Sequence, residues 1–242
     1  MILVVDAGNT RVKWATHDGA DFVKEGWCAN AGLADLEAQW AALSAPSVIV
    51  IANVAGDEAA RALTTLAGRW PLEPHWASSR RTQCGVTNLY ENPEQLGVDR
   101  WAAMIGARGL TTGACVVVNA GTAMTVDALS AGGEFLGGFI LPGFDLMQTS
   151  LAANTAKLRA LPGQFAVFPR TTRDAIASGA LQALCGAVDR MRAGMNAQGH
   201  ADPELIFSGG TGELVAARMG RPTRFADKLV LEGLVRIAKD VR

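Results

Sequence analysis

A short turn near the start of the chain carries residues that could hold the phosphates of a nucleotide. The stretch DAGNTRVKW spans residues 6–14 and follows an apolar segment, residues 1–5, that predicts a buried strand. Gly8 lets the backbone come close to a ligand, Lys13 supplies positive charge, and the Asp6 carboxylate could hold Mg²⁺ through water. The alternative is an ordinary tight hairpin, because Asp, Gly, Asn and Thr are also good turn formers.

A second turn of the same kind follows in the middle of the chain. The stretch CVVVNAGTAMTVDA, residues 115–128, again runs from an apolar strand through a glycine turn, and Thr122 could bond a phosphate oxygen. A third glycine-rich turn, SGGTG at residues 208–212, follows a predicted strand and suits backbone contact with adenine or ribose, although such runs are often plain loops. The repetition favours a phosphate site with two walls over two unrelated hairpins.

A carboxylate at the start of a predicted helix is the candidate for acid–base chemistry. Asp99 and Arg100 follow Leu96 and Gly97, where the pattern DRWAAMIGARG turns helical. Asp99 could accept a proton from an attacking hydroxyl while Arg100 pairs with an anionic substrate, or Asp99 could simply favour the helix N-terminus. Tyr90 is the chain's one tyrosine. It could line the same pocket, or it could be a half-buried packing residue whose hydroxyl contacts water.

The elements around these residues form two similar halves. Each half begins with a β-hairpin and continues into helices, which predicts a duplicated α/β fold with a cleft between the copies. We expect the boundary near Gly113, with one domain over residues 1–112 and the other over 113–242. The expected strands include 1–5, 11–14, 47–54 and 204–207, with a strand and turn over 115–122. The expected helices are 33–43, 96–109, 173–195 and 225–241.

Composition excludes several classes of protein. The formal net charge is −1 and no Lys/Arg run forms a stripe, so we expect no nucleic-acid partner. No apolar stretch reaches membrane-spanning length, and the N-terminus lacks the cationic segment of a cleaved signal, so we expect no membrane partner. The four cysteines and three histidines show no ligand spacing. We therefore assign no protein metal site and expect a reducing, cytoplasmic location.

Four segments together resemble one enzyme family. DAGNTRVKW, LGVDRW, VVNAGTAMTVD and GGFILPG, in this order, resemble the type III pantothenate kinases, which are similar to the Bvg accessory factors. The resemblance implies duplicated ribonuclease-H-like domains of the actin, heat-shock-protein-70 and sugar-kinase superfamily. It also implies ATP- and Mg²⁺-dependent phosphorylation of pantothenate to 4′-phosphopantothenate, the first step of coenzyme A biosynthesis.

The resemblance assigns roles to individual residues. The implied ATP contacts are Asp6, Ala7, Gly8, Asn9, Thr10, Arg11, Val12, Lys13 and Thr122. The implied pantothenate contacts are Tyr90, Gly97, Val98, Asp99, Arg100 and Thr172. Asp99 holds the position of the general base in a direct in-line transfer. Thr172 matches a residue that reaches the pantothenate of a neighbouring subunit, so a homodimer with a shared active site is implied.

Two positions depart from the family pattern. Asn119 stands where many members have an Asp that helps to bind a monovalent cation, usually K⁺ with NH₄⁺ as an alternative, so we expect that site to be weakened here. Thr171 stands where an Asn is common, just before Thr172. Two rival functions remain open: a kinase of another small hydroxylated substrate, and a regulatory accessory protein that promotes transcription.

Overall fold

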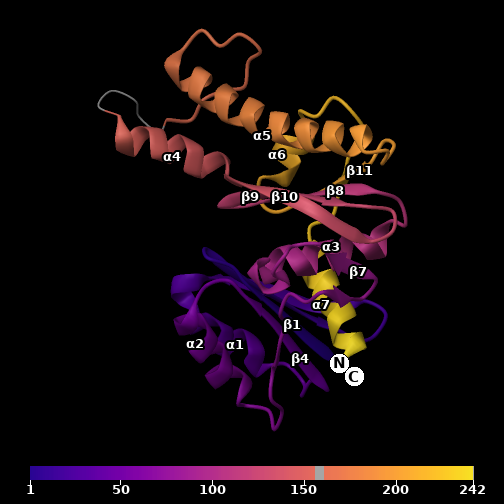
Figure 1. Cartoon of the computed structure of the whole chain (residues 1–242). Coiled ribbons are helices and arrows are strands. Elements are labelled where there is room, and N and C mark those ends of the chain that lie inside the picture. Colours follow the sequence, from indigo (N-terminus) through magenta and orange to yellow (C-terminus); the bar gives the residue numbers. More distant parts are fainter. Residues whose placement is uncertain (156–160, 242) are drawn as a thin grey trace. The chain divides into compact units, whose positions relative to one another are not determined.

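The computed structural model describes residues 1–155 and 161–241, and it divides into two compact units (Figure 1). The first unit combines Met1–Leu110 with Lys228–Arg242, and the second spans Thr111–Asp227. Each unit contains five strands in the same spatial order, and we describe the two units in turn.

The sheet of the first unit has the strand order β3-β2-β1-β4-β5. Its strands are β1 (Ile2–Ala7), β2 (Arg11–His17), β3 (Phe22–Ala29), β4 (Val48–Asn53) and β5 (His75–Trp76). The first three strands pair antiparallel, whereas β4 pairs parallel with both β1 and β5. Residues 2–5 of β1 are all buried, as is typical of a strand that helices cover on both faces.

Helices pack on this sheet from both sides (Figure 1). They are α1 (Asp35–Ala41), α2 (Asp57–Ala67), α3 (Val98–Leu110) and α7 (Leu229–Asp240). Helices α3 and α7 pack very closely, because a Cβ on Gly233 would lie 1.8 Å from the Ala102 carbonyl oxygen. A 3₁₀ helix follows β3 at Asn30–Gly32, and between β5 and α3 the chain forms a small hairpin, β6 (Thr82–Gln83) with β7 (Val86–Asn88), and a 3₁₀ turn at Pro93–Gln95.

The last helix differs from the sequence-based expectation. We expected residues 113–242 to form one domain, but α7 belongs to the first unit, where it packs on α3, β1 and β4. Its apolar residues, among them Leu231, Leu234 and Val235, are buried there. The helix also begins later than expected, because Phe225 lies on the short strand β12 (Arg224–Phe225) rather than in the helix.

The second unit repeats the strand arrangement of the first. Its strands are β8 (Cys115–Ala120), β9 (Ala123–Leu129), β10 (Glu134–Pro142), β11 (Glu204–Ser208) and β12, in the order β12-β11-β8-β9-β10. Here too the first three strands pair antiparallel, and β11 pairs parallel with both β8 and β12. Strands β8 to β12 therefore correspond one by one to β1 to β5, which confirms the predicted duplication.

The helices of the second unit are α4 (Phe144–Asn154), α5 (Thr172–Ala197) and α6 (Gly212–Ala216). Helix α5 packs on β8 and β9, and its residues Leu181, Leu184 and Val188 join the core of this unit. Among the described residues, no helix is long and apolar enough to cross a membrane.

Candidate functional site

The first phosphate turn connects β1 to β2. The Gly8 N–H donates to the Arg11 carbonyl at 3.0 Å and closes the turn. Asn30 braces it from the neighbouring segment, since its N–H donates to the Thr10 carbonyl at 2.9 Å and its Nδ2 to the Asn9 carbonyl at 3.3 Å. Residues 9–11 remain exposed, so a ligand can approach this part of the turn.

Asp6 lies at the end of β1, opposite Lys13 in the strand register. The pKa of the Asp6 carboxyl is raised from its usual 3.8 to about 7, mainly by burial and also by the negative charge of Asp99, while Lys13 opposes the shift. The structure thus brings Asp6, Lys13 and Asp99 into one electrostatic neighbourhood. Two neighbouring carboxylates suit a cation such as Mg²⁺, which proteins usually hold with one or two carboxylates and water.

The start of α3 carries the second group of predicted residues. The Asp99 Oδ1 accepts a hydrogen bond from the Arg100 N–H at 2.8 Å. A Cβ on Gly97 would lie 2.7 Å from the same Oδ1, so a larger residue at 97 would displace this carboxylate. The Arg100 side chain is buried, and its Nη1 donates to the Tyr90 hydroxyl at 3.2 Å. The predicted pair of Tyr90 and Arg100 is therefore in direct contact.

A polar cavity of about 840 Å³ lies beside this group within the first unit. Gly97 and Val98, two of the predicted substrate contacts, form part of its wall. Further wall residues include Asn53, Val54, Ser78, Ser79, Asn92 and Gln95. The ends of β4 and the segments around β6 and the 3₁₀ turn thus enclose space next to the start of α3.

The second phosphate turn, between β8 and β9, is held by two neighbouring segments of the second unit. The Gly143 N–H donates to the Thr122 carbonyl at 2.8 Å, and a Cβ on Gly143 would lie 2.0 Å from the Gly121 carbonyl oxygen. From the other segment, the N–H and the Oγ1 of Thr211 both donate to the Ala120 carbonyl at 3.1 Å. The turn at 208–212 is therefore packed directly on the second phosphate turn.

Gly209 makes this packing possible. Its φ is +90°, a conformation that L side chains rarely adopt, and a Cβ would lie 2.4 Å from the Ala120 carbonyl oxygen. Asn119 precedes this carbonyl on β8, where it pairs with Thr125 and Ser208 in the strand register. The glycine turn predicted at 208–212 has a structural requirement for glycine at this position.

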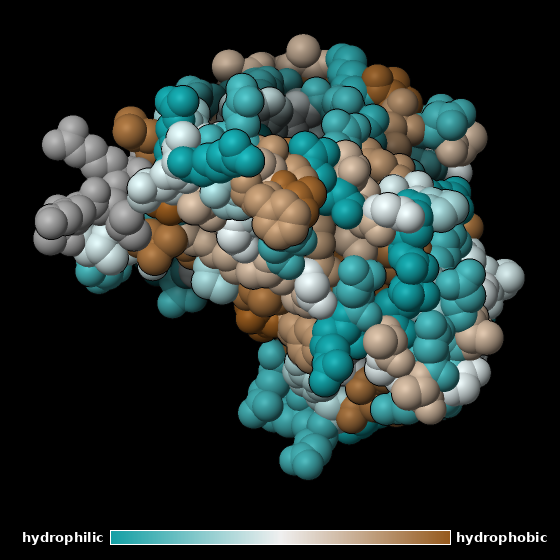
Figure 2. Space-filling view, turned by 90° about the horizontal axis from the view of Figure 1, so that it is seen from above, coloured by the Kyte–Doolittle hydropathy of each residue, from teal (hydrophilic) through white to brown (hydrophobic). Residues whose placement is uncertain are grey.

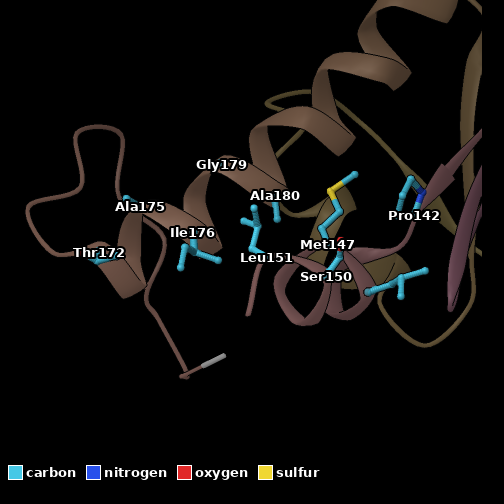
Figure 3. A pocket seen from close by; sticks show the side chains of 10 residues that line it. Pro142, Met147, Ser150, Leu151, Thr172, Ala175, Ile176, Gly179 and Ala180 are labelled. Carbon is cyan, nitrogen blue, oxygen red and sulfur yellow. The ribbon is translucent and has the colours of Figure 1, made fainter. Parts of the chain in front are cut away.

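Thr172 lies elsewhere in the second unit, at the first position of α5. It lines an apolar cavity of about 770 Å³ between α4 and α5, and Figure 3 shows side chains of both helices along it, among them Leu151, Ile176 and Ala180. Pro142 lines the same cavity, and it directly precedes the Gly143 that binds the second phosphate turn. The Thr171 hydroxyl accepts a hydrogen bond from the Asp174 N–H and so caps the N-terminus of α5. An Asn, which is common at this position in the family pattern, could form the same cap.

Several apolar side chains remain exposed in the second unit. Figure 2 shows patches of hydrophobic residues among hydrophilic ones on the face that it presents. Leu146 and Leu151, which line the cavity between α4 and α5, are 43% and 42% exposed. Neither the groups that surround Asp6 nor any others among the described residues form a cluster of three or more His, Cys, Asp or Glu that could hold a metal.

Comparison with known proteins identifies the family. The model of the type III pantothenate kinase family matches residues 2–194 of the chain. The chain belongs to the type III pantothenate kinases. A type III pantothenate kinase from Nitrosospira multiformis is 46% identical over 241 residues, which cover 99% of this chain and 92% of the relative. The chain is therefore a phosphotransferase that catalyses the ATP-dependent phosphorylation of pantothenate in coenzyme A biosynthesis.

Solved structures support the fold. A protein from Sinorhizobium meliloti described as a 2-dehydro-3-deoxygalactonokinase has a TM-score of 0.64 at 16% identity, covering 100% of this chain and 99% of its own. The activator of 2-hydroxyisocaproyl-CoA dehydratase from Clostridium difficile, solved with bound ADPNP, has a TM-score of 0.56 at 12% identity, covering 99% and 94%. These likenesses and the repeated strand order of the two units confirm the predicted duplicated α/β fold.

Some residues that shape the site were not expected from the sequence. Gly143 and Gly209 hold the second phosphate turn through close backbone contacts, and Arg81 holds the segment that carries Tyr90. GGFILPG and SGGTG stood out as glycine-rich, but nothing in either pattern names the Gly121 or Ala120 carbonyl as the contact. No pattern distinguishes Arg81 from its neighbour Arg80.

Proposed function

We propose that the chain transfers the γ-phosphoryl group of ATP directly to the terminal hydroxyl of pantothenate, with Asp99 as the general base. The observation that carries this proposal is that Asp99, at the start of α3, lies near enough to Asp6 of the first phosphate turn for its charge to help raise the Asp6 pKa. A base at that place could accept the hydroxyl proton while the phosphates occupy the turn. The hydroxyl oxygen then bonds to the γ-phosphorus as the bond to the β-phosphate oxygen breaks, and ADP leaves.

The remaining roles follow from the chemistry of each residue. Residues 6–13 bind the ATP phosphates through backbone N–H groups, hydroxyls and Lys13, and the Thr122 hydroxyl is a further phosphate contact. Bound with ATP, Mg²⁺ neutralises charge on the phosphates, and Asp6 would hold this ion through water. A raised pKa at Asp6 fits this role, because a nearby cation relieves the repulsion that raises it.

Arg100 binds the carboxylate of pantothenate and Tyr90 orients Arg100 through the hydrogen bond at 3.2 Å. The backbone of Gly97 and Val98 lines the same space. We further propose that the enzyme is a homodimer in which Thr172 of the partner subunit completes the pantothenate site. The apolar cavity next to Thr172 and the exposed Leu146 and Leu151 support an interface at α4 and α5.

Asn119 leaves at most a weak monovalent cation site, because an amide oxygen carries no charge. All four cysteines are free thiols in the structure, which supports a reducing location such as the cytoplasm.

The test of this function is product formation. Purified protein is incubated with Mg-ATP and a panel of pantothenate and other small hydroxylated acids and sugars, and the products are identified by mass spectrometry. We expect phosphopantothenate in large excess over any other product. Preferred phosphorylation of another acceptor would contradict the proposal, and tight, salt-resistant DNA binding in a mobility-shift assay would support the regulatory rival.

A further inference from the structure

Arg81, which lines the polar cavity beside Gly97 and Val98, holds the segment that carries Tyr90. The Arg81 guanidinium donates three hydrogen bonds to backbone carbonyls: Nη1 to Asn88 at 2.7 Å and to Tyr90 at 2.9 Å, and Nη2 to Glu91 at 3.2 Å. We call residues 88–93 the Tyr90 loop. A planar guanidinium with five fixed donors can bind several carbonyls at once, which a lysine ammonium on its flexible stem cannot do with the same geometry.

Asn88 also holds this loop through hydrogen bonds. Its side chain is fully buried, its Oδ1 accepts from the Tyr90 N–H at 3.0 Å, and its Nδ2 donates to the Pro93 carbonyl at 3.1 Å. The Asn88 N–H in turn donates to the Arg81 carbonyl at 2.8 Å. The backbone N–H and the carbonyl of Tyr90 are therefore both bound, one by Asn88 and the other by Arg81.

Tyr90, whose backbone is held in this way, contacts Arg100, the proposed substrate-binding residue. The Tyr90 hydroxyl accepts from the Arg100 Nη1, and the Arg100 guanidinium lies 5.9 Å from the Tyr90 ring centroid. With the Tyr90 backbone fixed at both polar groups, only the side-chain torsions remain to place its hydroxyl. A shift of this backbone would weaken the contact at 3.2 Å and release Arg100 from its position.

We propose that Arg81 is a positioning residue for the kinase reaction: it fixes the Tyr90 loop so that Tyr90 and Arg100 together bind the carboxylate end of the acceptor. This inference rests on the proposed function, since it takes Arg100 as the group that binds an anionic substrate. The Arg81 guanidinium donates to three backbone carbonyls of the Tyr90 loop, so we assign its role to the loop and not to direct binding of the substrate. Its loss therefore impairs the binding of pantothenate and leaves ATP binding at the first phosphate turn intact.

The experiment compares steady-state kinetics of the full chain and its variants Arg81→Ala and Arg81→Lys. We expect the KM for pantothenate to rise about tenfold or more in Arg81→Ala, as for a lost hydrogen bond to a charged group, with the KM for ATP nearly unchanged. Arg81→Lys keeps the charge but lacks the planar set of guanidinium donors, so its KM should lie between wild type and Arg81→Ala. An unchanged pantothenate KM, or an equal rise in the KM for ATP, would overturn the proposal.

Arg69→Ala is the matched control, because Arg69 also donates to a backbone carbonyl of the first unit, that of Glu37 at 3.3 Å, away from the Tyr90 loop. We expect wild-type kinetics from it. If Arg69→Ala raises the pantothenate KM as much as Arg81→Ala does, the effect is general loosening of the unit and the proposal fails.

A double-mutant cycle separates positioning from stability. In a Tyr90→Phe background the hydroxyl that Arg81 positions is gone, so Arg81→Lys should change the pantothenate KM by less than about twofold. Equal fold-changes in both backgrounds would contradict the proposal, and the lysine variant keeps this test available if Arg81→Ala does not fold. If wild type itself fails to phosphorylate pantothenate, the proposed function fails. If wild type is active and the Arg81 variants behave like it, only the present inference fails.

Discussion

The raised pKa of Asp6 predicts that replacing this carboxylate by an amide stabilises the ligand-free protein at neutral and alkaline pH. Asp6→Asn keeps the size of the side chain and removes the charge that burial and Asp99 both disfavour. Raising the pKa from 3.8 to about 7 costs the ionised form at most about 4 kcal/mol, at 1.36 kcal/mol per pKa unit. Because Asp6 is only partly buried, water screens part of this cost, and we expect about 2 kcal/mol.

The pH dependence has a definite sign. The pKa of Asp6 is higher in the folded protein than in the unfolded chain, so the folded state binds the proton more tightly. This contribution to stability is fully present below about pH 4 and is lost as the pH rises through about 7. Relative to wild type, Asp6→Asn should therefore gain stability between pH 4 and pH 8 and show little further change above that.

Urea unfolding in EDTA, followed by tryptophan fluorescence at several pH values, measures this difference. All six tryptophans lie before residue 111, so the signal reports on the first unit, which contains Asp6. Asp18→Asn is the matched control, because hydrogen bonds from the Asp21 and Ala20 N–H groups lower the pKa of Asp18 and its pH dependence should have the opposite sign. A stability difference between Asp6→Asn and wild type that does not vary with pH would refute the reasoning.

Three further substitutions test other parts of the site. Gly209→Ala should destabilise the protein by roughly 2 kcal/mol or more in thermal unfolding and raise the KM for ATP, because φ is +90° and the new Cβ would meet the Ala120 carbonyl; normal stability would contradict this. Tyr90→Phe should raise the pantothenate KM roughly tenfold while the KM for ATP stays constant, since Arg100 loses its bound hydroxyl; an unchanged KM would remove Tyr90 from the site. Asn119→Asp should make activity in K⁺ exceed that in Na⁺ by severalfold more than in wild type, and equal ratios would show that Asn119 does not govern the cation.

The parts of the fold that the sequence predicts are those with strong local patterns. The hairpins at the two phosphate turns follow from apolar strands on either side of Asp/Asn-Ala-Gly, and their repetition predicts the duplication of strands β1 to β5 as β8 to β12. The unit to which α7 belongs was not predictable from its own residues. Its apolar face could cover either sheet, and only tertiary packing against α3 decides in favour of the first unit.

The same distinction holds for the site. Tyr90 and Arg100 were predicted as neighbours in function, and the structure joins them by a hydrogen bond because the Tyr90 loop folds back toward α3. Arg81 was not predicted because its partners are backbone carbonyls, and every residue has one, so no pattern in the sequence indicates the contact. In the sequence, Gly209 is only one glycine of the glycine-rich turn at 208–212. Its positive φ and its close approach to the Ala120 carbonyl depend on the neighbouring sheet.

The most direct test of the account is the single-turnover rate of phosphoryl transfer to pantothenate in wild type and in Asp99→Asn, with ATP and pantothenate saturating and each binding constant measured separately. If Asp99 is the base, the transfer rate should fall by about 10²–10⁴-fold while both substrates still bind and the protein unfolds at a similar temperature. A transfer rate within about tenfold of wild type would contradict the central claim, because the reaction would then proceed without the carboxylate at the start of α3.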